Sequence, residues 1–164
     1  MRPSKDQWAM SLAHETAKRA TCLRRSVGAV LLNARGHVLA TGYNGVASGL
    51  PHCNEVTGRV LHADEPIHEQ SWTPIYGHAC SGANLPSGQG LDACQAIHAE
   101  QNALLQCRDV YSIEACYVTT SPCVTCVKML LNTSCKRIVF SEAYAHSEAS
   151  EWWLKAGHQW DQLS

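Results

Sequence analysis

The sequence predicts a layered α/β fold, in which helices pack against a β-sheet. Strand and helix signals alternate through the second half of the chain, and two neighbouring strand signals in the first half indicate a hairpin. The chain has 164 residues, of which 45% are hydrophobic and 16% are charged. This composition is typical of a globular protein with one core, so we expect residues 1–164 to form a single domain.

The first half is predicted to begin with a helix and to continue with the hairpin. Ser4 and Gln7 have the spacing of a capping box, and the helix that they open is expected to end near Ala20. Residues 27–32 and 37–42 carry strand signals, and the turn sequence between them joins them into a hairpin.

Regular structure is predicted again from Ile97 onwards. A helix is expected from residue 97 to about residue 107, because its apolar residues fall largely on one side. The remaining elements are strands at 115–120 and 136–141 and helices at 123–132 and 148–156. Gly157 is suited to end the last helix.

Between residues 43 and 93 the sequence has little periodicity and many Gly, Pro, Ser and His residues. Such a stretch far exceeds the usual loop of about 4–6 residues. It also carries potential metal ligands, namely His52, Cys53, His62, His68, His78 and Cys80. We therefore expect residues 54–93 to be an irregular insertion that a metal could order.

Charge and cysteine content narrow the classes of function. The net charge is −1 with neutral histidines, whereas proteins that bind nucleic acid polymers usually present a basic surface. The number of cysteines is odd, the first residues contain no apolar signal core, and no apolar run approaches the ~20 residues of a membrane span. We expect a cytoplasmic protein with reduced cysteines, and neither a membrane nor a nucleic acid polymer as partner.

A group of residues typical of zinc sites follows the irregular segment. His98, Cys123 and Cys126 provide three ligands, which leave a fourth coordination position for water, as a catalytic zinc requires. Glu100 remains as a carboxylate that can move protons. Together with Pro122, these residues form the spacing H-x-E…P-C-x-x-C, which is the signature of zinc-dependent deaminases.

The motif predicts a specific reaction. Both ligand segments are expected at helix starts, where the partial positive charge favours thiolate over thiol. Zinc lowers the pKa of bound water to about 7, so hydroxide could attack C4 of a cytosine ring. Glu100 would then pass protons to ring N3 and to the departing amine. The alternative is a structural zinc knuckle, but such a site normally has a fourth protein ligand, and this motif supplies none.

Several segments resemble the deoxycytidylate (dCMP) deaminase family. Residues 41–53, TGYNGVASGLPHC, resemble its glycine-rich loop. Residues 97–103 resemble its zinc helix, and residues 118–126 and 136–139 resemble its second ligand segment and the strand that follows. The resemblance extends over most of the chain.

The resemblance implies a cytidine deaminase-like, three-layer α/β/α fold around a mixed sheet of about five strands. It implies hydrolysis of dCMP to dUMP and ammonia with catalytic Zn²⁺, a reaction that feeds thymidylate synthesis. It further implies a homo-oligomer, usually a hexamer, that is activated by dCTP and inhibited by dTTP, with Mg²⁺ on the effector triphosphate. Two alternatives stay open: a deaminase of another cytosine or adenine substrate, such as a nucleoside or tRNA, and a zinc-binding module without catalysis.

Candidate ligand contacts lie in the glycine-rich loop. Asn44 could contact the sugar or the effector, and Gly45 the effector, because the backbone between Gly42 and Gly45 can approach a ligand closely. Asn44 could instead be a turn residue in the left-handed conformation.

Further candidates flank the strands. Arg24, Arg25 and Ser26 precede the first strand and could bind the 5′-phosphate, since arginine offers paired donors. They could equally form a solvated positive patch. Tyr144 follows the strand at 136–141 and could close over the ring or the sugar, or it could take part in ordinary packing.

Some members of the family carry a second, structural zinc. Cys22 and Cys53 stand where such members place two cysteines. Further ligands would have to come from His68, His78, Cys80 or Cys94. Alternatively, Cys22 and Cys94 are buried, and the loop cysteines are free thiols.

Overall fold

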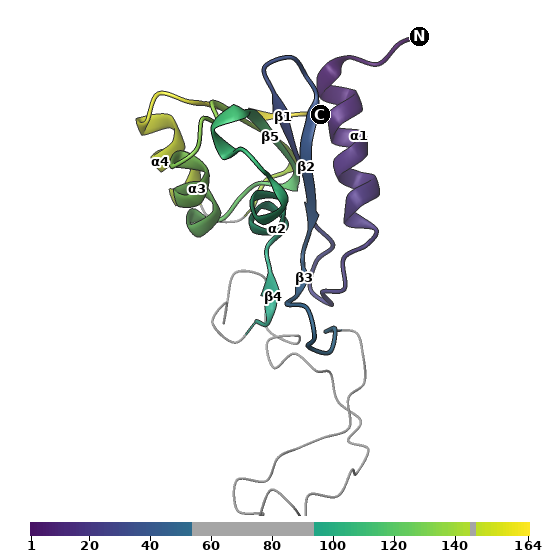
Figure 1. The fold of residues 1–164 in the computed structure, drawn as a ribbon. Coiled ribbons are helices and arrows are strands. Elements are labelled where there is room, and N and C mark those ends of the chain that lie inside the picture. Colours follow the sequence, from purple (N-terminus) through teal and green to yellow (C-terminus); the bar gives the residue numbers. More distant parts are fainter. Residues whose placement is uncertain (54–93, 145–146) are drawn as a thin grey trace, which may run out of the picture.

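The computed structural model describes residues 1–53, 94–144 and 147–164 (Figure 1). The helices are α1 (Lys5–Ala17), α2 (Ala99–Gln106), α3 (Val124–Leu131) and α4 (Glu148–Lys155). The main sheet contains β1 (Gly28–Asn33), β2 (Val38–Tyr43), β5 (Ile113–Thr120), β6 (Arg137–Glu142) and β7 (Gln159–Gln162). The short strands β3 (Gly45–Val46) and β4 (Ala96–Ile97) form a separate antiparallel pair.

The main sheet is mixed and has the order β2-β1-β5-β6-β7. Strand β1 runs antiparallel to β2 and β5, whereas β5, β6 and β7 run parallel to one another. Helix α1 lies on one face of the sheet, and α2, α3 and α4 lie on the other (Figure 1). The expected three-layer α/β/α fold around a five-stranded mixed sheet is therefore confirmed. Within the described ranges, no helix is long and apolar enough to cross a bilayer.

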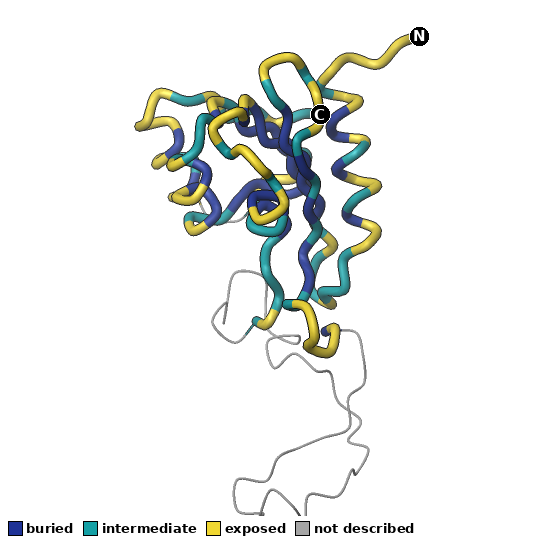
Figure 2. The backbone as a smooth tube through the Cα atoms, viewed as in Figure 1, coloured by how far each residue is buried: buried dark blue, intermediate teal, exposed yellow. Residues whose placement is uncertain are grey.

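Two apolar cores lie between the layers, and Figure 2 shows the buried stretches of the strands in dark blue. The core under α1 consists of Ala9, Met10, Ala13, Val30, Leu32, Ala115, Tyr117 and Val139. The core under the other helices includes Leu31, Val118, Val127, Leu130, Ile138, Phe140 and Trp153. Successive strand residues point to opposite faces, so the neighbours Leu31 and Leu32 belong to different cores.

The ends of the helices follow from local hydrogen bonds. In the capping box, the Gln7 N–H donates to Ser4 Oγ at 3.2 Å, and the Ser4 N–H donates to Gln7 Oε1 at 2.9 Å. The expected end of this helix near Ala20 is wrong, because the N–H groups of residues 18–20 donate to carbonyls three residues earlier and form tight turns. Gly157 has a φ of +82° just after α4, which suits the predicted stop.

Three strands, β3, β4 and β7, were not predicted from the sequence. The helix expected from residue 97 begins at Ala99, because Ala96 and Ile97 pair with β3. Strands β3 and β4 have two residues each and are too short to show a period. Strand β7, with the sequence QWDQ, lies at the edge of the sheet and has no buried residue, so it lacks the apolar pattern of a strand. The other expected elements are present with small shifts of their ends.

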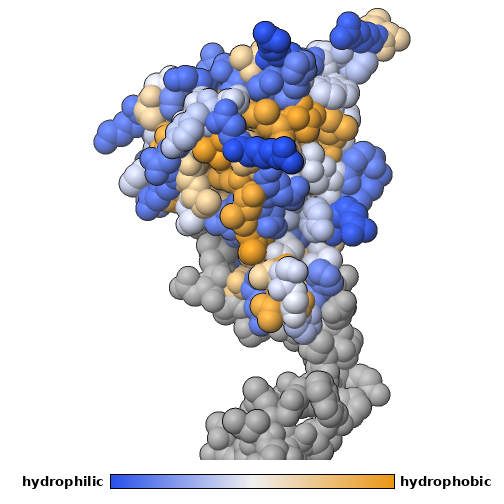
Figure 3. Space-filling model, in the orientation of Figure 1, coloured by the Kyte–Doolittle hydropathy of each residue, from blue (hydrophilic) through white to orange (hydrophobic). Residues whose placement is uncertain are grey.

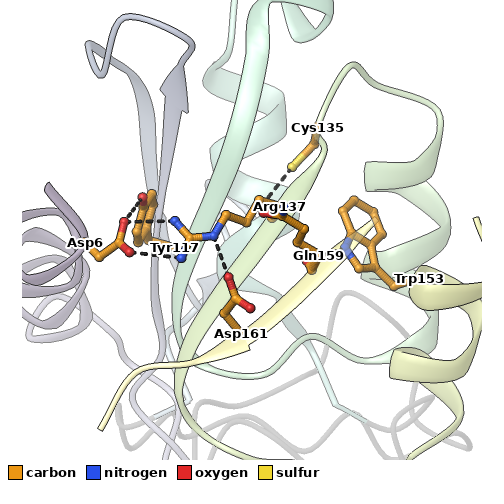
Figure 4. A network of polar contacts seen from close by, with 7 residues as sticks. All are labelled: Asp6, Tyr117, Cys135, Arg137, Trp153, Gln159 and Asp161. Atoms are coloured by element: carbon orange, nitrogen blue, oxygen red, sulfur yellow. Dashed lines mark hydrogen bonds and ion pairs between the residues drawn. The ribbon is translucent and has the colours of Figure 1, made fainter. Parts of the chain in front are cut away.

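A charged network, which we call the Asp6 clasp, ties the first helix to the last strand (Figure 4). The carboxylate of Asp6 accepts two hydrogen bonds from the Arg137 guanidinium, at 3.0 and 2.9 Å, and one from the Tyr117 hydroxyl at 2.6 Å. Nε of Arg137 also donates to the Asp161 carboxylate at 2.6 Å. The hydrogen bonds from Arg137 are the main reason that the pKa of Asp6 lies below its usual value.

Asp6→Asn should lower the free energy of unfolding by about 1–2 kcal/mol at pH 7, because it removes the charge from a partly buried, charge-assisted pair. The pKa of Asp6 is lower in the folded state, so its contribution is present above the unfolded pKa of about 3.9 and is lost as the pH falls through the folded value. Denaturant melts of both proteins at neutral and acidic pH measure the difference.

Glu15→Gln is the control, because it removes an exposed carboxylate from the same helix and should change stability little. The difference in the free energy of unfolding between the wild type and Asp6→Asn should disappear on acidification. A gap of the same size at both pH values would contradict the role assigned to Asp6.

Candidate metal centre

A cleft opens at the edge of the sheet where β5 and β6 end and β1 begins. It is lined by the β4–α2 junction, the β5–α3 turn, the segment before β1 and the residues that follow β2 and β6. The cleft contains about 640 Å³ of empty space that is open to solvent. The carboxyl ends of parallel strands are the usual place for ligands in α/β sheets.

Three donor atoms meet beside this cleft. Nδ1 of His98 lies 3.4 Å from the sulfur of Cys123 and 3.4 Å from that of Cys126, and the two sulfurs are 3.6 Å apart. A tetrahedral zinc ion about 2.3 Å from each sulfur and about 2.0 Å from the nitrogen requires separations of about 3.5–3.8 Å. The donor set therefore fits zinc. In the described part of the chain, it is the one group of three or more such side chains close enough to hold a metal.

The candidate zinc ligands lie at the starts of two helices, α2 and α3. His98 is the N-cap of α2, one residue before the first turn in which we expected it, and its N–H donates to Gln101 Oε1 at 3.0 Å. Cys123 is the N-cap of α3, and Cys126 lies in the first turn. The hydrogen bond between Cys123 and Cys126 is the main reason that the pKa of Cys123 falls to about 4, and the hydrogen bond with Cys123 raises the pKa of His98. One thiolate is thus favoured before metal binding, which displaces the remaining ligand protons.

Glu100 lies in the first turn of α2, beside the donor atoms but outside their group. It is only 3% exposed, and burial raises the pKa of its carboxyl to about 7. The positive charge of a bound zinc ion would favour the carboxylate form. A group balanced in this way can accept and return a proton near neutral pH.

Two arginines and a tyrosine also line the cleft. Arg24, Arg25 and Tyr144 all line it, as the sequence prediction requires, whereas Ser26 is exposed and lies outside the lining. The guanidinium of Arg25 lies over the Tyr144 ring, 5.7 Å from its centroid. Nη1 of Arg25 is buried and has no hydrogen-bond partner among the described residues. Its neighbour is Glu142 Oε2 at 3.9 Å.

Asn44 also lines the cleft, but it does not have the left-handed turn conformation that was the alternative, since no described residue other than glycine has a positive φ. Its Nδ2 donates to the Arg25 carbonyl at 2.7 Å, and its Oδ1 accepts from the Val27 N–H at 2.8 Å. Gly45 lies in β3 and outside the cleft lining.

The residues proposed for a second metal are only partly described. Cys22 and Cys94 are half-buried and line the cleft, and Cys53 is buried. These three cysteines do not form a metal-binding group with one another. The remaining candidates, His68, His78 and Cys80, lie outside the described residues, as does the whole of the expected insertion at 54–93.

Ser121 is a cleft residue whose role the sequence did not reveal. Its N–H donates to the Glu142 carbonyl at 2.8 Å, and its hydroxyl accepts from the Tyr144 N–H at 2.6 Å. It therefore links the turn that carries Cys123 to the segment that carries Tyr144. Its position just before Pro122 in the motif was the only available signal.

Comparisons with known proteins agree with this site. The family described as the cytidine and deoxycytidylate deaminase zinc-binding region matches residues 3–142. A deoxycytidylate deaminase from Schizosaccharomyces pombe is 34% identical over 147 residues, which are 87% of this chain but 38% of that protein. A deoxycytidylate deaminase from Mycobacterium phage D29 is 31% identical over 140 residues, which are 85% of this chain and 95% of that protein. The chain thus spans less than half of the yeast relative.

A solved structure has the same fold. The dCMP deaminase from the cyanophage S-TIM5, in complex with dCMP and dUMP, superimposes with a TM-score of 0.68 and 23% sequence identity. The alignment covers 99% of each chain.

Gly42→Ala should displace α2. A Cβ at this position would lie 2.2 Å from the Ala99 carbonyl oxygen and 2.4 Å from the Ala103 nitrogen, so α2 would have to move away with His98. We expect a loss of at least about 2 kcal/mol of stability and weaker retention of zinc. Thermal unfolding and zinc content after dialysis measure the two effects.

Gly45→Ala is the matched control, since its Cβ would meet the nearest atom at an ordinary 3.5 Å. If the two variants were equally stable and equally rich in zinc, the close approach at Gly42 would not be what places the ligands.

Proposed function

Because the chain belongs to the cytidine and deoxycytidylate deaminase zinc-binding family, we propose that it hydrolyses dCMP to dUMP and ammonia. The observation that carries the proposal is the content of one cleft. It is lined by donors of a zinc ion beside a protonatable Glu100, and also by an arginine with a buried N–H group that has no hydrogen-bond partner among the described residues. A cytosine nucleotide matches both groups of residues. Its base can meet the zinc site and Glu100, and its phosphate can accept hydrogen bonds from the arginine.

In this mechanism His98, Cys123 and Cys126 hold zinc, which when bound supplies a Lewis acid that activates water for attack. Glu100 takes a proton from the attacking water and delivers it to ring N3. As the C4–N4 bond breaks, Glu100 also helps to protonate the departing amine, so that ammonia leaves and a carbonyl remains at C4. The burial of Glu100 keeps its carboxyl able to act first as base and then as acid.

Several observations favour dCMP over the alternative substrates. The curated relatives described above carry the name deoxycytidylate deaminase. The net charge of −1 does not suit a tRNA-binding surface, and Arg24 and Arg25 concentrate positive charge at the cleft. We propose that they bind the 5′-phosphate and that Tyr144 packs against the bound nucleotide.

We also propose the regulation and assembly that the resemblance implies: a homo-hexamer activated by dCTP and inhibited by dTTP, with Mg²⁺ on the effector and Asn44 and Gly45 near it. A hydrophobic surface supports self-association. Val38 and Leu105 are 41% and 74% exposed, and Figure 3 shows apolar side chains gathered over α2 and the edge strand β2. The mass of the protein in solution tests the assembly.

A second, structural zinc is a further proposal, with Cys22, Cys53 and Cys94 as its described candidates. It is supported by the cysteine and histidine content of the chain. Metal analysis tests it, because a filled second site would give more than one zinc per chain.

Ammonia release should be fastest with dCMP when the protein is assayed with dCMP, deoxycytidine, dCTP and a cytosine oligonucleotide. The reason is that dCMP satisfies both the zinc end of the cleft and its cationic end. Each reaction is repeated with dCTP or dTTP and Mg²⁺. Preferred turnover of any other substrate would contradict the proposed function, and an unchanged rate with either effector would remove only its regulatory part.

Glu100→Gln should retain zinc but lose turnover by about 100-fold or more, because glutamine cannot transfer the proton. Glu114→Gln is the control, since it changes an exposed carboxylate on β5 and should keep both zinc and activity. Zinc content and kcat are measured on the same preparations. Full activity in Glu100→Gln would favour a zinc-binding module without catalysis.

A further inference from the structure

The side chain of Asn44 is directed towards the backbone that carries the cleft arginines. Asn44 is 7% exposed, and both ends of its amide are engaged, by the Arg25 carbonyl at 2.7 Å and by the Val27 N–H at 2.8 Å. Its backbone N–H also donates to the Val27 carbonyl at 3.1 Å. Three hydrogen bonds therefore fix the segment before β1 against the end of β2.

That segment presents the guanidinium of Arg25 at the cleft. Within the described structure the buried Nη1 makes no hydrogen bond, and Glu142 Oε2 is too distant, at 3.9 Å, to accept one. A buried donor without an acceptor costs free energy that a ligand oxygen would recover. Phosphate is the anion that the planar donor array of arginine suits well.

We propose that Asn44 is a positioning residue for substrate phosphate, and that it acts by holding the backbone of Arg25. The proposal rests on the proposed function, because it takes a nucleoside monophosphate as the substrate. Without the amide of Asn44, residues 25–27 lose two of the three hydrogen bonds that hold them against the end of β2, and the guanidinium is held less firmly at the cleft. The loss of the Asn44 amide should therefore lower kcat/KM mainly for substrates that carry a phosphate.

A direct contact between Asn44 and the sugar is the competing role. One lone pair of Oδ1 and one of the two Nδ2 hydrogens are already used, which leaves one lone pair and one N–H for a ligand. Deoxycytidine and dCMP contain the same sugar, so the loss of a sugar contact would affect both equally. The presence or absence of the phosphate therefore separates the two roles.

The test compares kcat/KM for dCMP and deoxycytidine in Asn44→Ala, Arg25→Ala and the double variant. For dCMP we expect a loss of about 10–100-fold in Arg25→Ala and about ten-fold in Asn44→Ala, mainly through KM. For deoxycytidine we expect changes under about two-fold. The double variant should be little worse than Arg25→Ala, because both substitutions act on one contact.

Asn102→Ala is the matched control. Its Nδ2 donates to the Tyr43 carbonyl at 2.8 Å, which is a similar bond beside the same strand, but it anchors α2 instead of Arg25. It should lower the rates with both substrates by the same factor. Asn44→Ser, whose hydroxyl can still accept a hydrogen bond, keeps the test in force if Asn44→Ala does not fold.

Equal losses with both substrates in the Asn44 variants would overturn this role, as would losses in Asn44→Ala and Arg25→Ala that multiply in the double variant. Either result would leave dCMP deamination itself intact. If the wild-type protein did not turn over dCMP, the proposed function would fail instead.

Discussion

The first turn of α2 has to lie directly on the end of the sheet, and the chemistry of the cleft depends on that contact. Gly42 has no Cβ, so the backbone near Ala99 and Ala103 can approach β2 more closely than any other residue would permit. Glu100 lies in the same turn and is buried, and desolvation is the main cause of the raised pKa of its carboxyl. The turn of α2 that packs on β2 is thus the turn that carries the acid–base group.

The reaction centre and the proposed phosphate-binding residues of the cleft are held by different kinds of structure. The metal donors and Glu100 are held at the starts of rigid helices, whereas Arg25 belongs to an irregular segment before β1. An irregular segment needs anchors to serve as a binding element, and the amide of Asn44 supplies two of them. The protein thus combines a rigid reaction centre with a phosphate-binding segment, in which the position of Arg25 depends on the hydrogen bonds that hold the segment.

The sequence was most informative where chemistry requires a fixed spacing. The interval between Cys123 and Cys126 and the proline before them place both cysteines at a helix start, and the structure has them there. Roles that depend on contacts between distant parts of the chain could not be predicted from the sequence. The residue type made Asn44 a candidate, but its bonds to a backbone 17 and 19 residues earlier have no signature. Strand β7 was missed because the edge of the sheet does not require apolar residues.

The Asp6 clasp has a consequence for how the chain acquires its shape. Asp6 is joined to Tyr117 and Arg137, which follow it by 111 and 131 residues. On the ribosome, α1 therefore emerges long before the strands that cover its apolar side, and at about 5–20 residues per second it waits for β6 for roughly 7–25 s. A helix of 13 residues is marginal by itself. Until β6 emerges, the nascent chain carries this frayed, partly apolar segment, and the Asp6 clasp closes only when Asp161 has left the exit tunnel.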